Sequence, residues 1–240
     1  MNSLSAEVSL QANVAFEVKS ISKHFTGMKR PAVDSVSMRL KEGEIVALLG
    51  ASGSGKSTLI RLICGLERCD RDSGEVHTPL GVLQAKGVLS RQIRRLRQQF
   101  AVIFQQFNLV GRLDVMTNAL SMVGLADQAF QRASTLSGGQ QQRAAVARAL
   151  LQGAKVLLAD EPVASLDPES SKRVMDSMTS LCQAHGMTLL VSLHQVHVAK
   201  QYCPRIIAMR EGQVLLDANQ DAFDEAFLSQ LYRQQPEEAL

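Results

Sequence analysis

The sequence predicts an α/β protein in which a parallel sheet is flanked by helices and joined to an antiparallel β subdomain. Three apolar runs, at residues 44–50, 154–162 and 188–194, alternate with segments of helical periodicity. Strands covered on both faces have such unbroken apolar sequences, and their alternation with helices is typical of parallel sheets. Residues 14–25 and 34–40 instead alternate between apolar and polar side chains, which indicates half-exposed antiparallel strands.

Length and composition set the class of protein. The 240 residues, 45% of them hydrophobic, suffice for one large domain, or for one domain with an inserted subdomain. No apolar run reaches the about 18 residues of a membrane span, and residues 1–16 lack the features of a signal peptide, so we expect a cytosolic protein. The cysteines form no C-x-x-C pair and are expected to be reduced thiols without a function: Cys64, Cys69, Cys182 and Cys203.

A local basic stretch at residues 91–100 contains Arg91, Arg94, Arg95 and Arg97. The net charge of +3 is too small for binding of nucleic acid across the whole molecule. Since no aromatic residues lie between the arginines as stacking platforms, a solvated helix face is favoured over a nucleic-acid surface. Contact with an acidic protein or with lipid headgroups is the remaining interpretation, and we expect no nucleic-acid partner.

The first apolar run ends in a glycine-rich loop that precedes a helical pattern. Residues 50–57, "GASGSGKS", match G-x-x-x-x-G-K-[ST] in full, between a strand and a helix as this motif requires. The glycines let backbone N–H groups surround a β-phosphate, Lys56 reaches the β- and γ-phosphate oxygens, and the Ser57 hydroxyl is a ligand for Mg²⁺. The candidate phosphate-binding residues are Gly50, Ser52, Gly53, Ser54, Gly55, Lys56, Ser57 and Thr58.

The second apolar run ends in two adjacent carboxylates. A nucleotide-bound Mg²⁺ needs a carboxylate at the end of a neighbouring strand, and Asp160 is placed to supply it. Successive side chains of a strand point in opposite directions, so Glu161 can point away from the metal ion and act on the attacking water, as a base or by positioning it. An Asp-Glu pair alone is more often a cap of the next element, but the loop at 50–57 favours the functional interpretation.

The rest of the chain continues the alternating pattern. A helix is expected at residues 169–185, before a third strand that ends at His194. A hairpin about Glu211 and Gly212 follows, and residues 221–235 have the pattern of an amphipathic helix.

A turn of serine and two glycines opens a further helical pattern at residues 134–151. Ser137, Gly138 and Gly139 present a hydroxyl and exposed backbone N–H groups at the positive end of a helix, without a carboxylate, histidine or cysteine. Such an arrangement suits an anion such as a phosphate.

Together these motifs resemble the ATP-binding subunit of an ABC transporter. The segments "GASGSGKS", "LSGGQ" (136–140), "VLLADEP" (156–162), "SLD" (165–167) and "SLH" (192–194) agree with this family in order and spacing over nearly the whole chain. The resemblance implies a P-loop NTPase fold, ATP and Mg²⁺ as cofactors, and a head-to-tail dimer that encloses ATP. In such a dimer, Ser137, Gly138, Gly139 and Gln140 complete the ATP site of the other copy.

Further roles follow from the resemblance, residue by residue. Gln105 lies where the family has a glutamine that senses Mg²⁺ and the attacking water, with Gln106 as the alternative. His194 resembles the switch histidine at the γ-phosphate, and Asp167 resembles the aspartate that bridges the subunits. Phe25 lies where an aromatic ring stacks on adenine, although a core phenylalanine is the alternative.

The resemblance also divides the chain of residues 1–240, a single nucleotide-binding domain, into parts. The ATP-binding core is expected at 14–105 and 137–220, with a C-terminal helix and tail at 221–240. Residues 106–136 correspond to the family's helical subdomain, which receives the membrane subunit, but they are unusually few. The predicted fold is therefore a P-loop core, an antiparallel β subdomain and a shortened helical subdomain.

Several segments, among them "FQQFNLVGRLDVMTN" and "DEPVASLDPESS", most resemble the ATPase subunits of bacterial phosphonate importers. The implied function is ATP hydrolysis that drives import of a phosphonate or a related oxyanion such as phosphite. The implied partners are a second copy, membrane permease subunits and, indirectly, a periplasmic binding protein, with the chain peripheral on the cytoplasmic face of the inner membrane. The alternatives are the ATPase of an exporter or lipoprotein extractor, and an ATP-dependent dimerising switch without transport.

Overall fold

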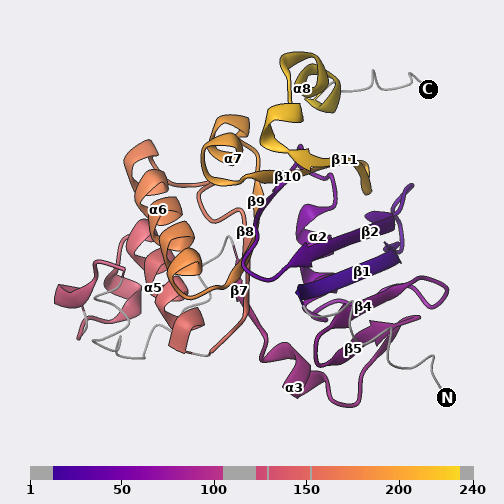
Figure 1. The fold of residues 1–240 in the computed structure, drawn as a ribbon, viewed down its shortest axis with the longest axis horizontal. Helices are drawn as coiled ribbons and strands as arrows, with labels where there is room; N and C mark the ends of the chain where they lie inside the picture. Colours follow the sequence, from indigo (N-terminus) through magenta and orange to yellow (C-terminus); the bar gives the residue numbers. More distant parts are fainter. Residues whose placement is uncertain (1–12, 105–122, 129, 152, 233–240) are drawn as a thin grey trace.

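The computed structural model describes residues 13–104, 123–128, 130–151 and 153–232, and a six-stranded sheet forms its centre (Figure 1). Its strand order is β11-β10-β3-β9-β8-β7, with β11 antiparallel to β10 and the other pairs parallel. The predicted parallel sheet is thus confirmed. Its strands are β3 (Ile45–Leu49), β7 (Phe100–Ile103), β8 (Val156–Asp160), β9 (Thr188–Leu193), β10 (Arg205–Arg210) and β11 (Gln213–Asn219).

A second, antiparallel sheet has the order β2-β1-β4-β5-β6. The two strands predicted from alternation are β1 (Val14–Lys23) and β2 (Val33–Lys41). The sequence analysis did not identify the three short strands, β4 (Glu75–Thr78), β5 (Gly81–Ala85) and β6 (Val88–Leu89). Their apolar patterns are too short to be distinctive. These strands form through pairing with distant segments, as β4 does with β1, and local sequence does not display such pairing.

Helices and the antiparallel sheet cover the two faces of the central sheet (Figure 1). Along β3, Ile45, Ala47 and Leu49 face a core built with α5, α6, α7 and α8, whereas Val46 and Leu48 face α2 and the antiparallel sheet. This two-sided burial is why the strand is apolar at every position. The helices are α2 (Lys56–Ile63), α3 (Ile93–Arg97), α5 (Gly138–Leu151), α6 (Pro168–Ala184), α7 (Val196–Tyr202) and α8 (Glu225–Tyr232).

The predicted hairpin at Glu211 and Gly212 joins β10 to β11 and also fixes the loop before α2. Both residues have positive φ angles, 52° and 83°, as a tight hairpin turn requires. The Gly212 N–H donates to the carbonyl oxygen of Ser54 at 3.1 Å, and the Asp34 N–H donates to that of Gly212 at 2.9 Å. The hairpin therefore ties the phosphate-binding loop to the start of β2.

The basic stretch at residues 91–100 includes helix α3. Helix α3 exposes most of its arginines, while Arg97 is half-buried and donates to the carbonyl oxygens of Cys64, at 3.3 Å, and Gly65. One arginine thus caps the end of α2, and the others form a solvated face.

All four cysteines are free and buried, and burial raises the thiol pKa of Cys182 and Cys203 to about 12. In the described ranges, no helix combines the length and the apolar character that a bilayer span requires.

Part of the expected helical subdomain lies outside the described residues. Residues 106–122 belong to that part, and Gln105, the last residue of the preceding core segment, also lies outside the described residues. The role of Gln105 and the extent of the 106–136 subdomain therefore stay predictions. From residue 123 onward the chain has two short 3₁₀ helices, Ala126–Gln128 and Ala133–Thr135, before α5 begins.

Candidate active site

The glycine-rich loop at 50–57 connects the end of β3 with the start of α2, as predicted. Gly53 and Gly55 have φ angles of 77° and 100°, a region that residues with a Cβ rarely adopt. A Cβ at Gly55 would lie 2.2 Å from the carbonyl oxygen of Ala32, and one at Gly50 would lie 2.4 Å from that of Met209. The loop therefore needs glycine for space as well as for conformation.

The other residues of the loop differ in exposure. Ser52 is exposed, Thr58 is half-buried, and the Ser54 hydroxyl is buried without a hydrogen-bond partner among the described residues.

Lys56 buries its ammonium group inside this loop. The side chain is 3% exposed, and Nζ donates to the carbonyl oxygens of Gly50, at 2.8 Å, and Ala51, at 3.0 Å. Burial lowers the pKa of Lys56 below its ordinary value, although the carboxylates of Glu161 and Asp160 act in the opposite direction. Phosphate oxygens are strong acceptors for such an ammonium group, so an entering phosphate can replace the loop carbonyls.

The Asp160 carboxylate at the end of β8 meets Ser57 across the site. Asp160 is 5% exposed, and its Oδ1 accepts hydrogen bonds from the Ser57 and Ser192 hydroxyls, both at 2.9 Å. Ser192, on β9, also accepts the Glu161 N–H at 2.8 Å. The sequence analysis missed Ser192, whose signal was a single hydroxyl inside the apolar run that ends at His194.

Glu161 and His194 form a direct pair at the ends of β8 and β9. Glu161 has a φ of 50°, a strained value for a residue with a side chain. Its Oε1 lies 2.5 Å from His194 Nε2, and His194 Nδ1 donates to the Gly50 carbonyl oxygen at 3.0 Å. A backbone carbonyl oxygen can only accept, so the ring nitrogen that faces Gly50 is the donor in that contact.

The pair also borders a small hollow. Its volume is about 100 Å³, and Glu161, Ser192 and His194 are among the residues that line it. This hollow is large enough for water beside the carboxylate of Glu161.

Ser137 and Asp167 lie at the exposed starts of two adjacent helices. The Ser137 N–H donates to Gln140 Oε1 at 2.8 Å, and the Gln140 N–H donates to the Ser137 hydroxyl at 3.4 Å, which is a capping box for α5. Asp167 Oδ1 accepts the Ser170 N–H at 2.9 Å and caps α6, and hydrogen bonds from Ser170 lower the Asp167 pKa. A Cβ at Gly139 would touch Ser170 at 3.4 Å, so the two starts are neighbours. Gly138, the first residue of α5, is half-buried.

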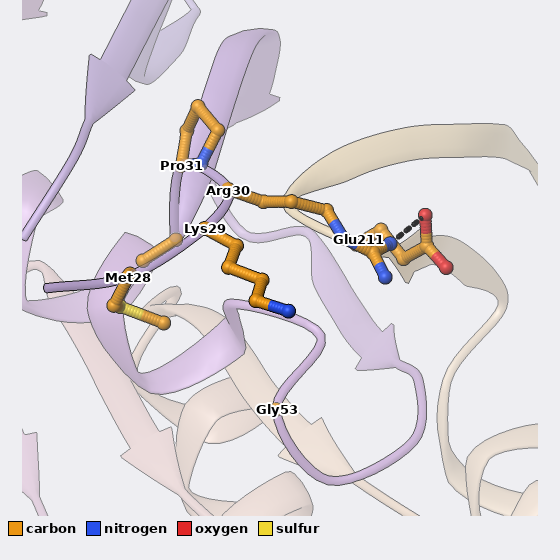
Figure 2. A pocket seen from close by; sticks show the side chains of 7 residues that line it. Met28, Lys29, Arg30, Pro31, Gly53 and Glu211 are labelled. Carbon is orange, nitrogen blue, oxygen red and sulfur yellow. Dashed lines mark ion pairs between the residues drawn. The ribbon is translucent and has the colours of Figure 1, made fainter. Parts of the chain in front are cut away.

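A hollow of about 360 Å³ lies beside the phosphate loop, lined by residues 28–32, Gly53 and Glu211 (Figure 2). Arg30 pairs with Glu211 across it, and the side chain of Lys29 extends towards the turn that contains Gly53 (Figure 2). Phe25 begins the turn into this segment, since its carbonyl oxygen accepts the Met28 N–H at 3.2 Å. Lys23 Nζ lies 5.0 Å from the centroid of the Phe25 ring. The sequence analysis missed Lys29, which no motif includes.

Comparisons with known proteins agree with this geometry. The family model described as ABC transporter matches residues 33–164. The phosphonates import ATP-binding protein PhnC 1 of Cupriavidus metallidurans is 47% identical over 255 aligned positions, which cover 94% of this chain and 89% of that protein. The protein of the same name in Pseudomonas aeruginosa is 47% identical, with 92% of this chain and 89% of that protein covered.

Solved structures of similar fold include two ATP-binding cassettes. The dimeric post-hydrolysis state of the cassette MJ0796, bound to ADP and Pi, is 29% identical with a TM-score of 0.74, and covers 87% of this chain and 100% of that chain. The protein cbiO1 of Clostridium perfringens, part of an ABC transporter complex, is 25% identical with a TM-score of 0.76, and covers 91% of this chain and 94% of that chain.

Two glycine variants separate conformational strain from steric overlap in the phosphate loop. Gly53→Ala introduces a left-handed residue into open space, so we expect a loss of about 1–2 kcal/mol in the free energy of unfolding. Gly55→Ala adds the overlap with the Ala32 carbonyl, so the loss should exceed that of the first variant by at least about 1 kcal/mol. Denaturant titration of the nucleotide-free protein measures both losses. Equal losses would show that the loop moves away from Ala32 without cost.

Proposed function

This chain belongs to the ABC transporter family and is an ATPase of that family, and we propose that it drives import of a phosphonate or a related oxyanion such as phosphite. The observation that supports the ATPase chemistry is the convergence of Lys56, Glu161 and His194 at the carboxyl ends of three parallel strands. The support for the substrate is the 47% identity to phosphonates import ATP-binding proteins over nearly the whole chain.

We propose that Ser57 and Asp160 hold Mg²⁺ together with the phosphates of ATP. The fit rests on the hydrogen bond of 2.9 Å that joins their side-chain oxygens, both hard ligands of the kind that Mg²⁺ prefers. When bound, the ion neutralises charge on the β- and γ-phosphate oxygens. Gln105, which by resemblance is a further ligand, lies outside the described residues.

The roles of the catalytic residues follow from the contacts around Glu161. In the proposed reaction, water attacks the γ-phosphorus, the Glu161 carboxylate accepts a proton from this water, and the bond to the leaving ADP breaks. Lys56 and His194, both within 4 Å of Glu161 Oε1, are placed to stabilise the charge on the transferred phosphoryl group. The Gly50 carbonyl keeps the imidazole oriented through Nδ1.

We propose that the signature turn, formed by Ser137, Gly138 and Gly139, acts on the nucleotide of a second copy. The hydrogen bonds of Ser137 and Asp167 all lie at the exposed starts of their own helices, so both positions are accessible to another subunit. With Gly138, Gly139 and Gln140, Ser137 would donate to the γ-phosphate held by Lys56 of the other copy. The dimeric structure of the cassette MJ0796, bound to ADP and Pi, supports this arrangement.

We propose that the hollow beside Gly53 receives part of the nucleotide outside the phosphate loop. Lys29 is positioned to contact a phosphate or the ribose, since its side chain extends towards Gly53 (Figure 2). Phe25 is the stacking candidate for adenine at the start of the same segment. Its contact with Lys23 occupies one face of the ring, so stacking would use the other face.

Coupling to transport is the part of the proposal that concerns residues 106–136. The alignment to the relative from Cupriavidus metallidurans has 255 positions, more than the 240 residues of this chain, so the relative contains residues that this chain lacks. A shortened segment at 106–136 would account for this difference in length. We place the chain on the cytoplasmic face of the inner membrane, bound to permease subunits that receive substrate from a periplasmic binding protein.

The short subdomain also favours one alternative, in which ATP-dependent dimerisation acts as a switch without transport. The names of the relatives, which specify import, favour the importer over an exporter or a lipoprotein extractor.

Replacement of the proposed base should stop hydrolysis without loss of nucleotide. Glu161→Gln keeps the shape of the side chain but cannot accept a proton, so ATP turnover should fall by at least about 100-fold while ATP remains bound. Phosphate release measures the turnover, and light scattering in the presence of ATP should reveal a dimer. The matched control is Glu169→Gln, a surface change on α6 that should leave turnover unchanged. Parental turnover in Glu161→Gln would remove Glu161 from this role.

Mixing two inactive variants tests the sharing of sites between copies. Lys56→Ala disables the phosphate loop, and Ser137→Arg blocks the signature turn, so neither homodimer has an intact site. A mixed dimer has one intact composite site, and ATPase activity should return in the mixture if a single site turns over. Failure of the mixed sample to form any ATP-dependent dimer would contradict sharing in trans.

Reconstitution with membrane partners tests the transport function. Membranes of the native cell should yield a permease in complex with this chain, and a phosphonate with its binding protein should increase ATP hydrolysis by the reconstituted complex several-fold. Bound permease without stimulation by any phosphonate or phosphite would exclude the proposed substrate. ATP-dependent dimerisation without a co-purified permease would favour the switch.

A further inference from the structure

The C-terminal helix α8 is anchored beside the catalytic histidine. Its first turn is capped by Asp224, whose Oδ1 accepts the Phe227 N–H at 2.7 Å. Phe223, just before the helix, is fully buried, and its ring meets that of Phe227 edge-on at 5.3 Å between centroids. Leu231 is also buried, in the same apolar core as Leu193 at the end of β9. The helix therefore has a fixed position relative to the strand that leads to His194.

The last described residue of α8 contacts His194 directly. The Tyr232 hydroxyl donates a hydrogen bond to the His194 backbone carbonyl oxygen at 3.0 Å. His194 lies between the end of β9 and the start of α7, so it belongs to neither element. Burial raises the pKa of Tyr232, which keeps the hydroxyl protonated and able to donate at neutral pH.

Tyr232 thus holds the backbone of His194, while the imidazole ring contacts Gly50 and Glu161. The ring bridges the Gly50 carbonyl and the Glu161 carboxylate at 3.0 and 2.5 Å, and hydrogen bonds of these lengths tolerate little displacement. A shift of the backbone at residue 194 would move both ring nitrogens relative to their partners. A loss of alignment well below 1 Å is sufficient to reduce the rate of an enzyme.

We infer that Tyr232 is a positioning residue, whose hydroxyl keeps His194 in register with Glu161 and Gly50 and so couples the C-terminal helix to ATP hydrolysis. The inference rests on the proposed role of His194. It assigns a function to a helix that none of the nucleotide-binding motifs includes.

Tyr232→Phe removes this hydrogen bond and keeps the ring. We expect kcat for ATP to fall about three- to tenfold, the effect of one neutral hydrogen bond, with KM little changed because the phosphate loop is untouched. Tyr202→Phe is the matched control, since the Tyr202 hydroxyl donates to Asp176 Oδ1 at 2.8 Å on the surface of α6 and α7. Parental kcat in Tyr232→Phe, or an equal loss in both variants, would overturn the inference.

A spectroscopic measurement separates positioning from a general effect on stability. The chain has two tyrosines, so 3-fluorotyrosine labelling should give two ¹⁹F resonances, assigned with the two phenylalanine variants. A non-hydrolysable ATP analogue with Mg²⁺ should shift the Tyr232 resonance and leave that of Tyr202 in place, and His194→Ala should abolish this response. A Tyr232 resonance that ignores the nucleotide would contradict the coupling.

Failure of this inference and failure of the proposed function give different results. Parental ATP turnover in His194→Ala would show that the proposed role of the histidine is wrong, and the role of Tyr232 with it. An inactive His194→Ala beside a fully active Tyr232→Phe would overturn the role of Tyr232 alone.

Discussion

Burial of the Lys56 ammonium group is the constraint on which the rest of the site depends. A buried ammonium group is costly unless acceptors and opposite charges surround it. The loop supplies two carbonyl oxygens within 3.0 Å, and Glu161 supplies a carboxylate at 3.8 Å. These groups can meet only because β3 lies beside β9, and β9 beside β8, so that their carboxyl ends share one edge.

The same edge explains the hydroxyl groups around the carboxylates. Asp160 is almost fully buried, and the hydroxyls of Ser57 and Ser192 replace the water that it loses. Ser192 also fixes the backbone of Glu161, which has a strained positive φ. Ser192 on β9 therefore orients the side chain of Asp160 and the backbone of Glu161, the residue whose carboxylate contacts His194.

The exposed starts of α5 and α6 are already ordered within a single chain. The capping box of Ser137 and Gln140, and the cap that Asp167 forms on α6, satisfy these groups within one chain. A surface that is already ordered loses little conformational freedom when it binds, which favours a dimer that forms and separates with the state of the nucleotide. In the proposed dimer, Lys56 of one subunit and the capped helix starts of the other would face the same nucleotide.

The sequence by itself determined those elements whose residue pattern has only one physical explanation. The apolar runs specified the three parallel strands β3, β8 and β9, because both faces are covered, whereas the parallel strand β7 was not predicted. The motif at 50–57 specified a phosphate loop, because its glycines and lysine have no other common use. The short strands β4 to β6 were not predicted, since their order comes from successive pairing of β4 with β1, β5 with β4 and β6 with β5. The contacts of Ser192 and Tyr232, and the place of Lys29 in the hollow beside Gly53, were likewise decided only by the fold. Ser192 contacts Asp160 and Tyr232 contacts His194, both distant along the chain, and such contacts have no periodicity or spacing that a sequence can display.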